Sequence, residues 1–337
     1  MKILVTGGAG FIGFHVCKLL LSKKHKVTTI DNLNSYYDIN LKKARLKELK
    51  KNINKKNFKF YKADLCNFDK IKTIFKKEKF DKVIHLAAQA GVRFSLKHPR
   101  QYIQSNIVAF FNTMELSKIF KIKHFIYASS SSVYGANIKL PYSEKEPADH
   151  PTQLYAATKR SNEIMAHSYS ALYNLPTSGL RFFTAYGPWG RPDMALFLFT
   201  KNILDNKKIN VFNYGNHSRD FTYIDDITDA IEIISRNIPK KISKKKFKKL
   251  PCDSSFYPFE IYNIGNGKKI PLMNYIKLVE KHLNLKAKIN FLPLQKGDIE
   301  HVKSTTDKLY KKFNFVPKTD VRLGIKKFVN WYLKYYN

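Results

Sequence analysis

Short apolar runs alternate with amphipathic segments through the first half of the chain. Residues 3–5 and 27–30 have the length and composition of buried strands, whereas residues 11–21 repeat apolar side chains at helical spacing. Regular alternation of this kind predicts a parallel sheet with helices on both faces, which is a doubly wound α/β fold. We expect strands at 2–5, 27–30, 58–61, 83–86, 124–128 and 177–182, and helices at 11–21, 41–51, 68–75, 107–120 and 154–173.

The pattern changes after Phe183, where Pro, Gly and aromatic residues become frequent and the apolar runs shorten. We interpret residues 1–182 as the sheet domain, to which 221–237 and 260–265 return. Residues 183–220 and 266–337 then form a smaller C-terminal α/β region that caps the sheet, with short helices at 272–283 and 306–313. The Lys-rich, Pro-bounded stretch 239–258 is typical of a surface insertion, and we expect it to take no part in chemistry.

A formal net charge of +35 is compatible with binding nucleic acid, an anionic membrane or an anionic substrate. Nine of the 61 basic residues are Arg, and nucleic-acid surfaces favour Arg as well as Lys. The Lys excess therefore indicates solvated faces, and we expect neither nucleic acid nor membrane as a partner. No apolar run has the length of a membrane span. Three widely spaced cysteines, Cys17, Cys66 and Cys252, favour a reducing cytoplasm over a disulfide framework or a metal site.

Three glycines, Gly7, Gly10 and Gly13, join the first predicted strand to the first predicted helix. Glycine allows positive φ and a close approach of the backbone to a pyrophosphate, and the N–H groups that open the helix face the anion. Asp31, at the end of the second strand, can accept hydrogen bonds from the adenosine ribose and would repel a 2′-phosphate. The combination predicts a Rossmann-type dinucleotide site that takes NAD rather than NADP.

Further cofactor contacts are expected at the carboxyl ends of the strands, where ligands of doubly wound folds bind. Asp64 follows the third strand and can contact the adenine amine, although capping a turn is an alternative role for its carboxylate. The expected cofactor-binding residues are Gly7, Gly10, Phe11, Ile12, Gly13, Asp31, Asn32, Asp64, Leu65, Leu86, Ala87, Ala88, Asn106, Tyr155 and Lys159.

Tyr155 and Lys159 lie four residues apart in the predicted helix at 154–173, and therefore on one helix face. A tyrosine hydroxyl has a pKa of about 10 and is a poor base at neutral pH unless a nearby positive charge favours its phenolate. Ser130, at the tip of the fifth strand, can bridge Tyr155 and a substrate oxygen, although the serine run at 129–132 can also be a plain polar loop. These residues suit removal of a proton from a sugar hydroxyl while hydride leaves the carbon.

The residues at 6–13, 129–135 and 155–159 together resemble the extended short-chain dehydrogenase/reductase superfamily, and within it the nucleotide-sugar epimerases. The stretches at 31–38, 90–93 and 181–195 are similar to those of UDP-glucuronate 4-epimerases, often labelled capsular polysaccharide epimerases. The similarity covers nearly the whole chain. Two positions depart from the pattern: Ala185 stands where Val is usual, and Gln295 stands where galactose-type epimerases commonly carry Arg.

The resemblance also implies roles for individual residues. Thr184 and Arg191 would lie near the C6 carboxylate of the sugar and Arg219 would bind the diphosphate, whereas pairing of Arg191 with Asp193 or Asp220 is the alternative. A homodimer joined by a four-helix bundle is implied, with the helices at 107–120 and 154–173 as candidates. The implied catalytic triad is Ser130, Tyr155 and Lys159, and the substrate-binding set is Arg93, Ser132, Thr184, Arg191, Arg219 and Asp298.

Related reactions are less consistent with this sequence. Sugar-nucleotide dehydratases carry an Asp-Glu pair at the positions of Ser131 and Ser132, and the Glu of xylose-forming decarboxylases is missing from the same loop. Oxidation and re-reduction at C4 remain, so we expect an NAD-dependent UDP-sugar 4-epimerase acting on UDP-glucuronate. UDP-glucose or UDP-N-acetylglucosamine is the alternative substrate, and a Rossmann protein that binds RNA through its basic surface is a remote alternative.

Overall fold

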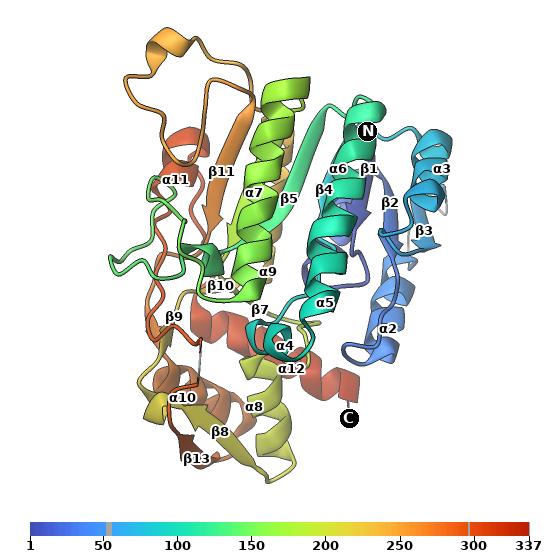
Figure 1. Cartoon of the computed structure of the whole chain (residues 1–337). Coiled ribbons are helices and arrows are strands. Elements are labelled where there is room, and N and C mark those ends of the chain that lie inside the picture. Colours follow the sequence, from blue (N-terminus) through green and yellow to red (C-terminus); the bar gives the residue numbers. More distant parts are fainter. Residues whose placement is uncertain (52–55, 296, 337) are drawn as a thin grey trace.

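A seven-stranded parallel sheet forms the centre of the protein, in the strand order β11-β6-β5-β4-β1-β2-β3 (Figure 1). The computed structural model describes residues 1–51, 56–295 and 297–336. Chain order reverses between β1 and β4, so the sheet is doubly wound and the Rossmann-type prediction is confirmed. The strands are β1 Lys2–Thr6, β2 Lys26–Asp31, β3 Phe58–Lys62, β4 Lys82–His85, β5 His124–Ser130, β6 Thr177–Phe182 and β11 Phe259–Ile264.

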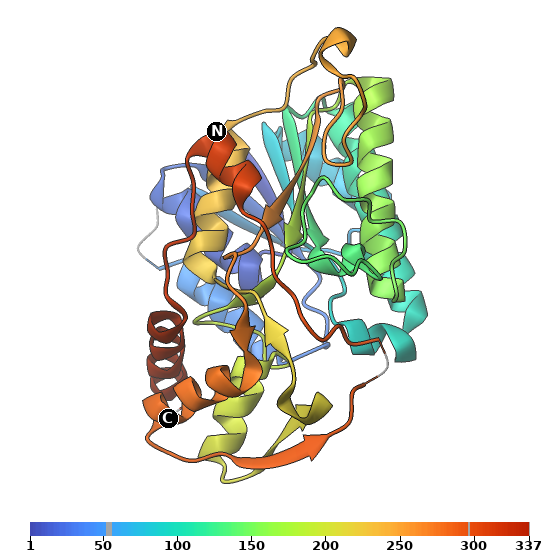
Figure 2. The same ribbon diagram turned by 90° about the vertical axis from the view of Figure 1, so that its left-hand side faces the viewer.

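Helices cover both faces of the sheet, and each face has its own apolar core. On one face, α1 (Phe11–Ser22) and α9 (Ile224–Arg236) pack together, and α2 (Ile39–Leu49) adds buried leucines. On the other face lie α3 (Phe68–Glu78), α6 (Ala109–Ile119) and α7 (Leu154–Tyr173). Figure 2 shows α9 and α7 on opposite sides of the strands. Burial on both faces explains why the strands are continuous apolar runs.

A smaller α/β region lies at one end of the sheet (Figure 1). Its core is rich in aromatic side chains, including Phe197, Tyr275 and Phe328. Two short parallel pairs, β13 with β8 and β10 with β7, connect its segments. The elements are β7 Thr184–Tyr186, α8 Ala195–Leu204, β8 Lys208–Phe212, β9 Ser218–Arg219, β10 Phe221–Tyr223, β12 Ile270–Pro271, α10 Leu272–Leu283, β13 Lys288–Leu292 and α12 Val321–Tyr336.

Some elements differ from the sequence expectation. The helix expected at 107–120 begins with a π-helical stretch, Ile103–Val108, and then continues as α6. Before it lie two short helices that the sequence pattern did not reveal, α4 (Val92–Lys97) and α5 (Pro99–Tyr102). The expected helix at 306–313 is α11 (Asp307–Phe313). Helices α8 and α12 were missed because their aromatic residues match strand composition as well as helix composition.

The Lys-rich stretch 239–258 is a loop with one short 3₁₀ turn, Lys244–Lys246. It projects at the end of the sheet opposite the smaller α/β region (Figure 1). Asp253 anchors its base through an ion pair with Lys308 of α11 at 2.7 Å. The exposed lysines of the loop are Lys240, Lys241, Lys244, Lys245, Lys248 and Lys249.

Candidate active site

A cavity of about 910 Å³ lies where the carboxyl ends of the central strands meet the smaller α/β region. Two groups of side chains face each other across it. The sheet domain contributes the glycine turn, the ends of β2, β4 and β5, and the start of α7, whereas the smaller region contributes the segments around Thr184, Arg191 and Arg219. Apart from Asn106, every residue expected to contact cofactor or substrate lines this single cavity.

The glycine turn leaves an open cradle at the start of α1. Gly7 has a φ of +72°, and a Cβ atom there would lie 2.9 Å from the Cα of Ala87. A Cβ on Gly13 would collide with the carbonyl oxygen of Gly7. The N-cap of α1, Gly10, provides no side-chain cap, so the first N–H groups of the helix are left for an anion. The cradle therefore fits the pyrophosphate of a dinucleotide.

Asp31 is held at the end of β2 by two backbone groups. Its Oδ2 accepts from the N–H of Ala9 at 3.1 Å, and its Oδ1 accepts from the N–H of Leu33 at 2.9 Å. Burial raises the pKa of this carboxyl, and the two backbone hydrogen bonds act in the opposite direction. These bonds aim the carboxylate at the cavity, where ribose hydroxyls of an adenosine would donate to it. The residues present fit NAD.

Asp64 has the turn-capping role that the sequence left open, and its contact with the adenine amine stays a prediction. Its Oδ1 accepts from the N–H of Cys66 at 2.8 Å, which caps the turn after β3. Its Oδ2 accepts from the side-chain amide of Asn32 at 3.0 Å, and both residues line the cavity. The turn therefore fixes the carboxylate at the cavity wall.

Asn106 is the expected contact residue that does not line the cavity. It is buried in the π-helical stretch, where its Oδ1 accepts from the N–H of Gln89 at 2.8 Å and its Nδ2 donates to Thr158 at 3.1 Å. The side chain therefore ties the segment after β4 to α7. Asn106 thus helps to position the cavity wall, and its direct contact with the cofactor stays an untested prediction.

Tyr155, Lys159 and Ser130 converge at the junction of β5 and α7. Lys159 is 2% exposed, and its Nζ donates to the carbonyl oxygen of Ala128 at 2.8 Å. Burial lowers the pKa of Lys159 to about 8. Burial raises the pKa of Tyr155, while a hydrogen bond shared with Ser130 and the positive charge of Arg191 act in the opposite direction. The arrangement provides a hydroxyl relay beside a buried cation.

Ser130 is also the N-cap of the 3₁₀ turn Ser131–Tyr134. Its Oγ accepts from the N–H of Ser132 and donates to the Ser132 hydroxyl, both at 3.2 Å. The serine run is therefore a built turn with two hydroxyls facing the cavity, rather than an unstructured polar loop.

A buried ion pair supports this junction. Glu163 of α7 accepts from Arg181 of β6 through two hydrogen bonds of 2.9 Å, and from the Ser129 hydroxyl at 2.6 Å. Arg181 and Glu163 are fully buried, and the guanidinium lies 4.7 Å from the ring centre of Tyr134. Although burial alone would raise the pKa of Glu163, the Arg181 charge holds it below its usual value. The pair joins β5, β6 and α7 directly behind the catalytic candidates.

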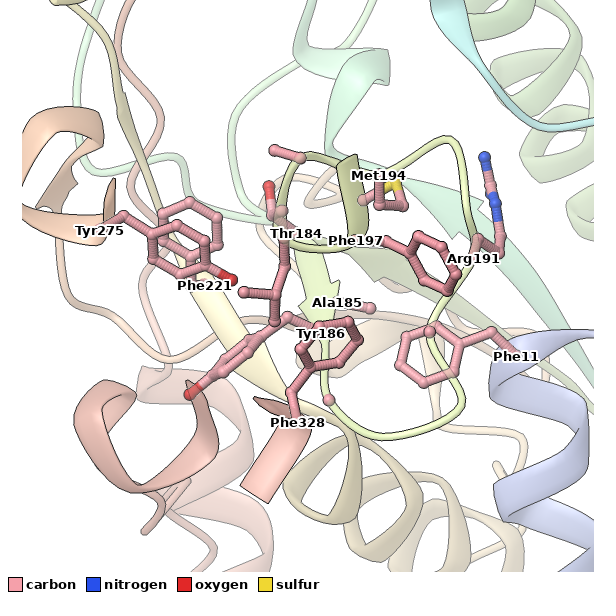
Figure 3. Close-up of a pocket in the computed structure, with 14 residues that line it drawn as sticks. Phe11, Thr184, Ala185, Tyr186, Arg191, Met194, Phe197, Phe221, Tyr275 and Phe328 are labelled. Carbon is pink, nitrogen blue, oxygen red and sulfur yellow. The ribbon is translucent and has the colours of Figure 1, made fainter. Parts of the chain in front are cut away.

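Arg191 is paired with Asp193, which was one of the two alternatives that the sequence left open. Its Nε donates to Asp193 Oδ1 at 3.0 Å and its Nη2 to Oδ2 at 2.5 Å. Asp220, the other alternative, is fully buried and accepts instead from the N–H groups of Gly267 and Ser304, both at 3.0 Å. Figure 3 shows the segment from Thr184 to Met194, with the nitrogens of Arg191 pointing away from Phe11 and Phe197.

Arg93, Asp298 and Arg219 come together from three distant segments. Arg93 donates to Asp298 at 2.8 Å and lies 4.4 Å from the ring centre of Phe212. Arg219 donates to the carbonyl oxygens of Ser218 and Glu300 at 3.0 and 2.9 Å. Two cations therefore line the cavity close to Asp298, and an anionic group can bind to them. Lys296, beside Gln295 in the segment that departs from the family pattern, lies outside the described residues.

Sequence reasoning missed Arg45, which is fully buried in α2. It donates to the carbonyl oxygen of Ala9 at 2.8 Å, to that of Trp189 at 2.6 Å and to the Tyr37 hydroxyl at 2.7 Å. The side chain thus joins the glycine turn to the loop that carries Arg191. A lone arginine among the lysines of this helix was the available signal.

The part of the chain that the structure describes contains neither a candidate membrane span nor a candidate metal site. In those residues no helix combines the length and the apolar character needed to cross a membrane. No group of His, Cys, Asp and Glu side chains among them could hold a metal ion.

Comparisons with known proteins show the family of the chain. Residues 3–265 match the model of the NAD dependent epimerase/dehydratase family. The chain is 51% identical to Protein CapI of Staphylococcus aureus, over 100% of this chain and 99% of that protein. It is 43% identical to a probable UDP-glucuronate 4-epimerase of Rhizobium meliloti, over 98% of this chain and 97% of the relative.

The fold also matches a crystal structure of UDP-glucuronic acid 4-epimerase from Bacillus cereus in complex with UDP-glucuronic acid and NAD. The TM-score is 0.86 at 31% identity, with 99% of each chain covered. The match spans both the sheet domain and the smaller α/β region. The chain therefore belongs to the NAD dependent epimerase/dehydratase family.

Proposed function

We propose that the protein interconverts UDP-glucuronate and UDP-galacturonate by NAD-dependent epimerisation at C4. Family membership and the similarity to UDP-glucuronate 4-epimerases support the reaction type and the use of NAD. The observation that carries the proposal is that Ser130 and Tyr155 line the same cavity as the guanidinium of Arg191. The same cavity therefore offers groups for proton transfer and a cation for a carboxylate.

The residues of this chain would hold and move one proton. Tyr155 takes the proton from the C4 hydroxyl, directly or through Ser130, and returns it later. Lys159 favours the phenolate as an ammonium group, which it is below its pKa of about 8. The glycine cradle and Asp31 would hold NAD, which would supply reversible hydride exchange with C4 of the sugar.

The carboxylate of the sugar needs its own binding group. A 4-keto uronate is a β-keto acid and can lose carbon dioxide, so an epimerase must hold the carboxylate while the ring turns. Arg191 offers a planar fork for a carboxylate, and the Thr184 hydroxyl lines the same wall. Arg93 and Arg219 are the candidates for the diphosphate.

We further propose a homodimer joined through α6 and α7. Both helices carry large apolar side chains that are exposed in the single chain, for example Phe111 at 43%, Ile164 at 58% and Leu172 at 70%. Burial of such residues in a helix pair is a common basis for dimers. The three free cysteines support a reducing compartment such as the cytoplasm. Size-exclusion chromatography with light scattering tests the dimer.

The function is tested by incubating purified protein, without added NAD, with UDP-glucuronate, UDP-glucose and UDP-N-acetylglucosamine in separate reactions. Chromatographic separation of the products should show UDP-galacturonate from the first substrate. Faster conversion of UDP-glucose or UDP-N-acetylglucosamine would favour the alternative substrates. RNA binding that is far stronger than nonspecific binding, together with inactivity on all three sugars, would favour the remote alternative.

A further inference from the structure

Asp193 is paired with the guanidinium of Arg191, which the proposed function assigns to the carboxylate of the substrate. The two carboxylate oxygens of Asp193 accept from Nε and Nη2 of Arg191 in a bidentate pair. Tyr36, which follows β2, donates its hydroxyl to Asp193 Oδ2 at 3.0 Å and so holds the carboxylate from a second side. All three side chains line the cavity. The guanidinium of Arg191, which lines the cavity, is thus already paired with a carboxylate of the protein itself.

The charges of Arg191 and Asp193 affect how the carboxylate of a substrate would bind. The side chains of Arg191 and Asp193 are 21% and 30% exposed, so water screens them only in part. Although burial alone would lower the pKa of Arg191, the Asp193 carboxylate holds it above its usual value. An incoming sugar carboxylate therefore meets a guanidinium that is already paired with Asp193, and the negative charge of Asp193 repels it.

The loop that carries Arg191 lies beside a second, smaller void. Figure 3 shows the nitrogens of Arg191 pointing away from Phe11 and Phe197. These residues line a small void of about 30 Å³, most of whose other lining groups are apolar. Arg191 and Met194 line both this void and the large cavity, whereas Asp193 and Tyr36 line the large cavity.

We propose that Asp193 is a specificity-determining residue that competes with the sugar carboxylate for Arg191. This inference rests on the proposed function, because it assumes that Arg191 receives a uronate. The competition lowers the affinity for UDP-glucuronate and UDP-galacturonate alike. It thereby limits how tightly either sugar acid is held, and lets the product leave after each cycle. A neutral sugar such as UDP-glucose has no carboxylate and is not subject to this competition.

The test is Asp193→Asn in the NAD-bound enzyme. The substitution removes the competing charge and keeps the size of the side chain. We expect the dissociation constant of UDP-glucuronate, measured by calorimetry, and its KM to fall by about ten-fold or more, as for one charge-assisted hydrogen bond. The dissociation constant of UDP-glucose should stay unchanged. Tyr36→Phe, which frees Asp193 from one partner, should weaken UDP-glucuronate binding, because a freer carboxylate pairs more fully with Arg191.

Asp205→Asn is the matched control, because Asp205 makes an exposed ion pair with Lys207 outside the cavity and gives the same change in net charge. It should leave both dissociation constants unchanged. Weaker or unaltered UDP-glucuronate binding by Asp193→Asn would overturn the inference and would mean that Asp193 merely positions Arg191. If Asp193→Asn does not fold, an unaltered affinity in Tyr36→Phe overturns it.

Failure of the proposed function has a different signature. A wild-type protein that does not convert UDP-glucuronate contradicts the function, whatever Asp193 does. The dissociation constants still report on the competition in that case, because calorimetry needs binding and no turnover.

Discussion

The sheet domain and the smaller α/β region contribute to one cavity in different ways. In the sheet domain most candidate residues lie in short contiguous motifs at the ends of parallel strands, and Tyr155 and Lys159 lie one turn apart at the start of α7. In the smaller region the groups come from segments far apart in sequence, as with Thr184, Arg219 and Asp298. The difference suggests that the first region performs the chemistry and the second selects the sugar.

Tyr155→Phe should give the largest effect and tests the chemical role of the sheet domain. The change removes the proton acceptor and keeps the ring, so we expect kcat to fall by about a hundred-fold or more. Bound NAD and the melting temperature should be unchanged. Turnover of UDP-glucuronate gives kcat, and near-normal turnover would exclude Tyr155 as the base.

Arg181→Met tests how much the buried pair of Arg181 and Glu163 stabilises the junction that carries the catalytic candidates. The change leaves Glu163 buried without its main partner, and the expected loss is about 3–5 kcal/mol of unfolding free energy. Arg160→Met is the control, because Arg160 also pairs with Glu163 but is 21% exposed and should cost about 1 kcal/mol or less. Urea denaturation measures both values. Equal losses would show that the buried pair has no special role.

Asp31→Ala tests the cofactor contact. Loss of a charged hydrogen bond should weaken NAD binding by about 1.5–3 kcal/mol. Asp229→Ala is the control, because Asp229 is exposed and lies outside the cavity. Nucleotide released by heat from the wild type should be NAD(H). The assignment fails if NADP(H) predominates or if Asp31→Ala binds NAD normally.

Lys159 gives a smaller, pH-dependent effect on stability. Its pKa is about 8 in the folded protein and 10.5 in the unfolded chain, so between these values the unfolded state binds more protons. The stability contributed at this site therefore rises with pH from about 8 to 10.5. In protein freed of NAD, the stability of Lys159→Met relative to the wild type should be highest below pH 8 and should decrease above it. Thermal melts across this range measure the difference, and parallel pH curves would contradict it.

Sequence could predict the fold and the sheet-domain half of the site because both depend on local patterns. Gly7, Asp31 and Tyr155 stand at fixed positions relative to their own strands and helices. The partners of Arg191 and Arg93 could not be assigned, since they depend on how distant loops meet. Arg45 and the Glu163–Arg181 pair were missed because a buried charge in a helix or strand has no periodic signature.

The central claim is that Arg191 binds the carboxylate of the sugar. The substrate preference of Arg191→Ala tests this claim most directly. The measurement compares kcat/KM for UDP-glucuronate and UDP-glucose in the wild type and the variant. We predict a loss of about 2–5 kcal/mol in transition-state stabilisation for UDP-glucuronate and a much smaller loss for UDP-glucose. Release of a decarboxylated 4-keto pentose should accompany it. Equal losses on both sugars would mean that Arg191 only shapes its loop, and would contradict the account.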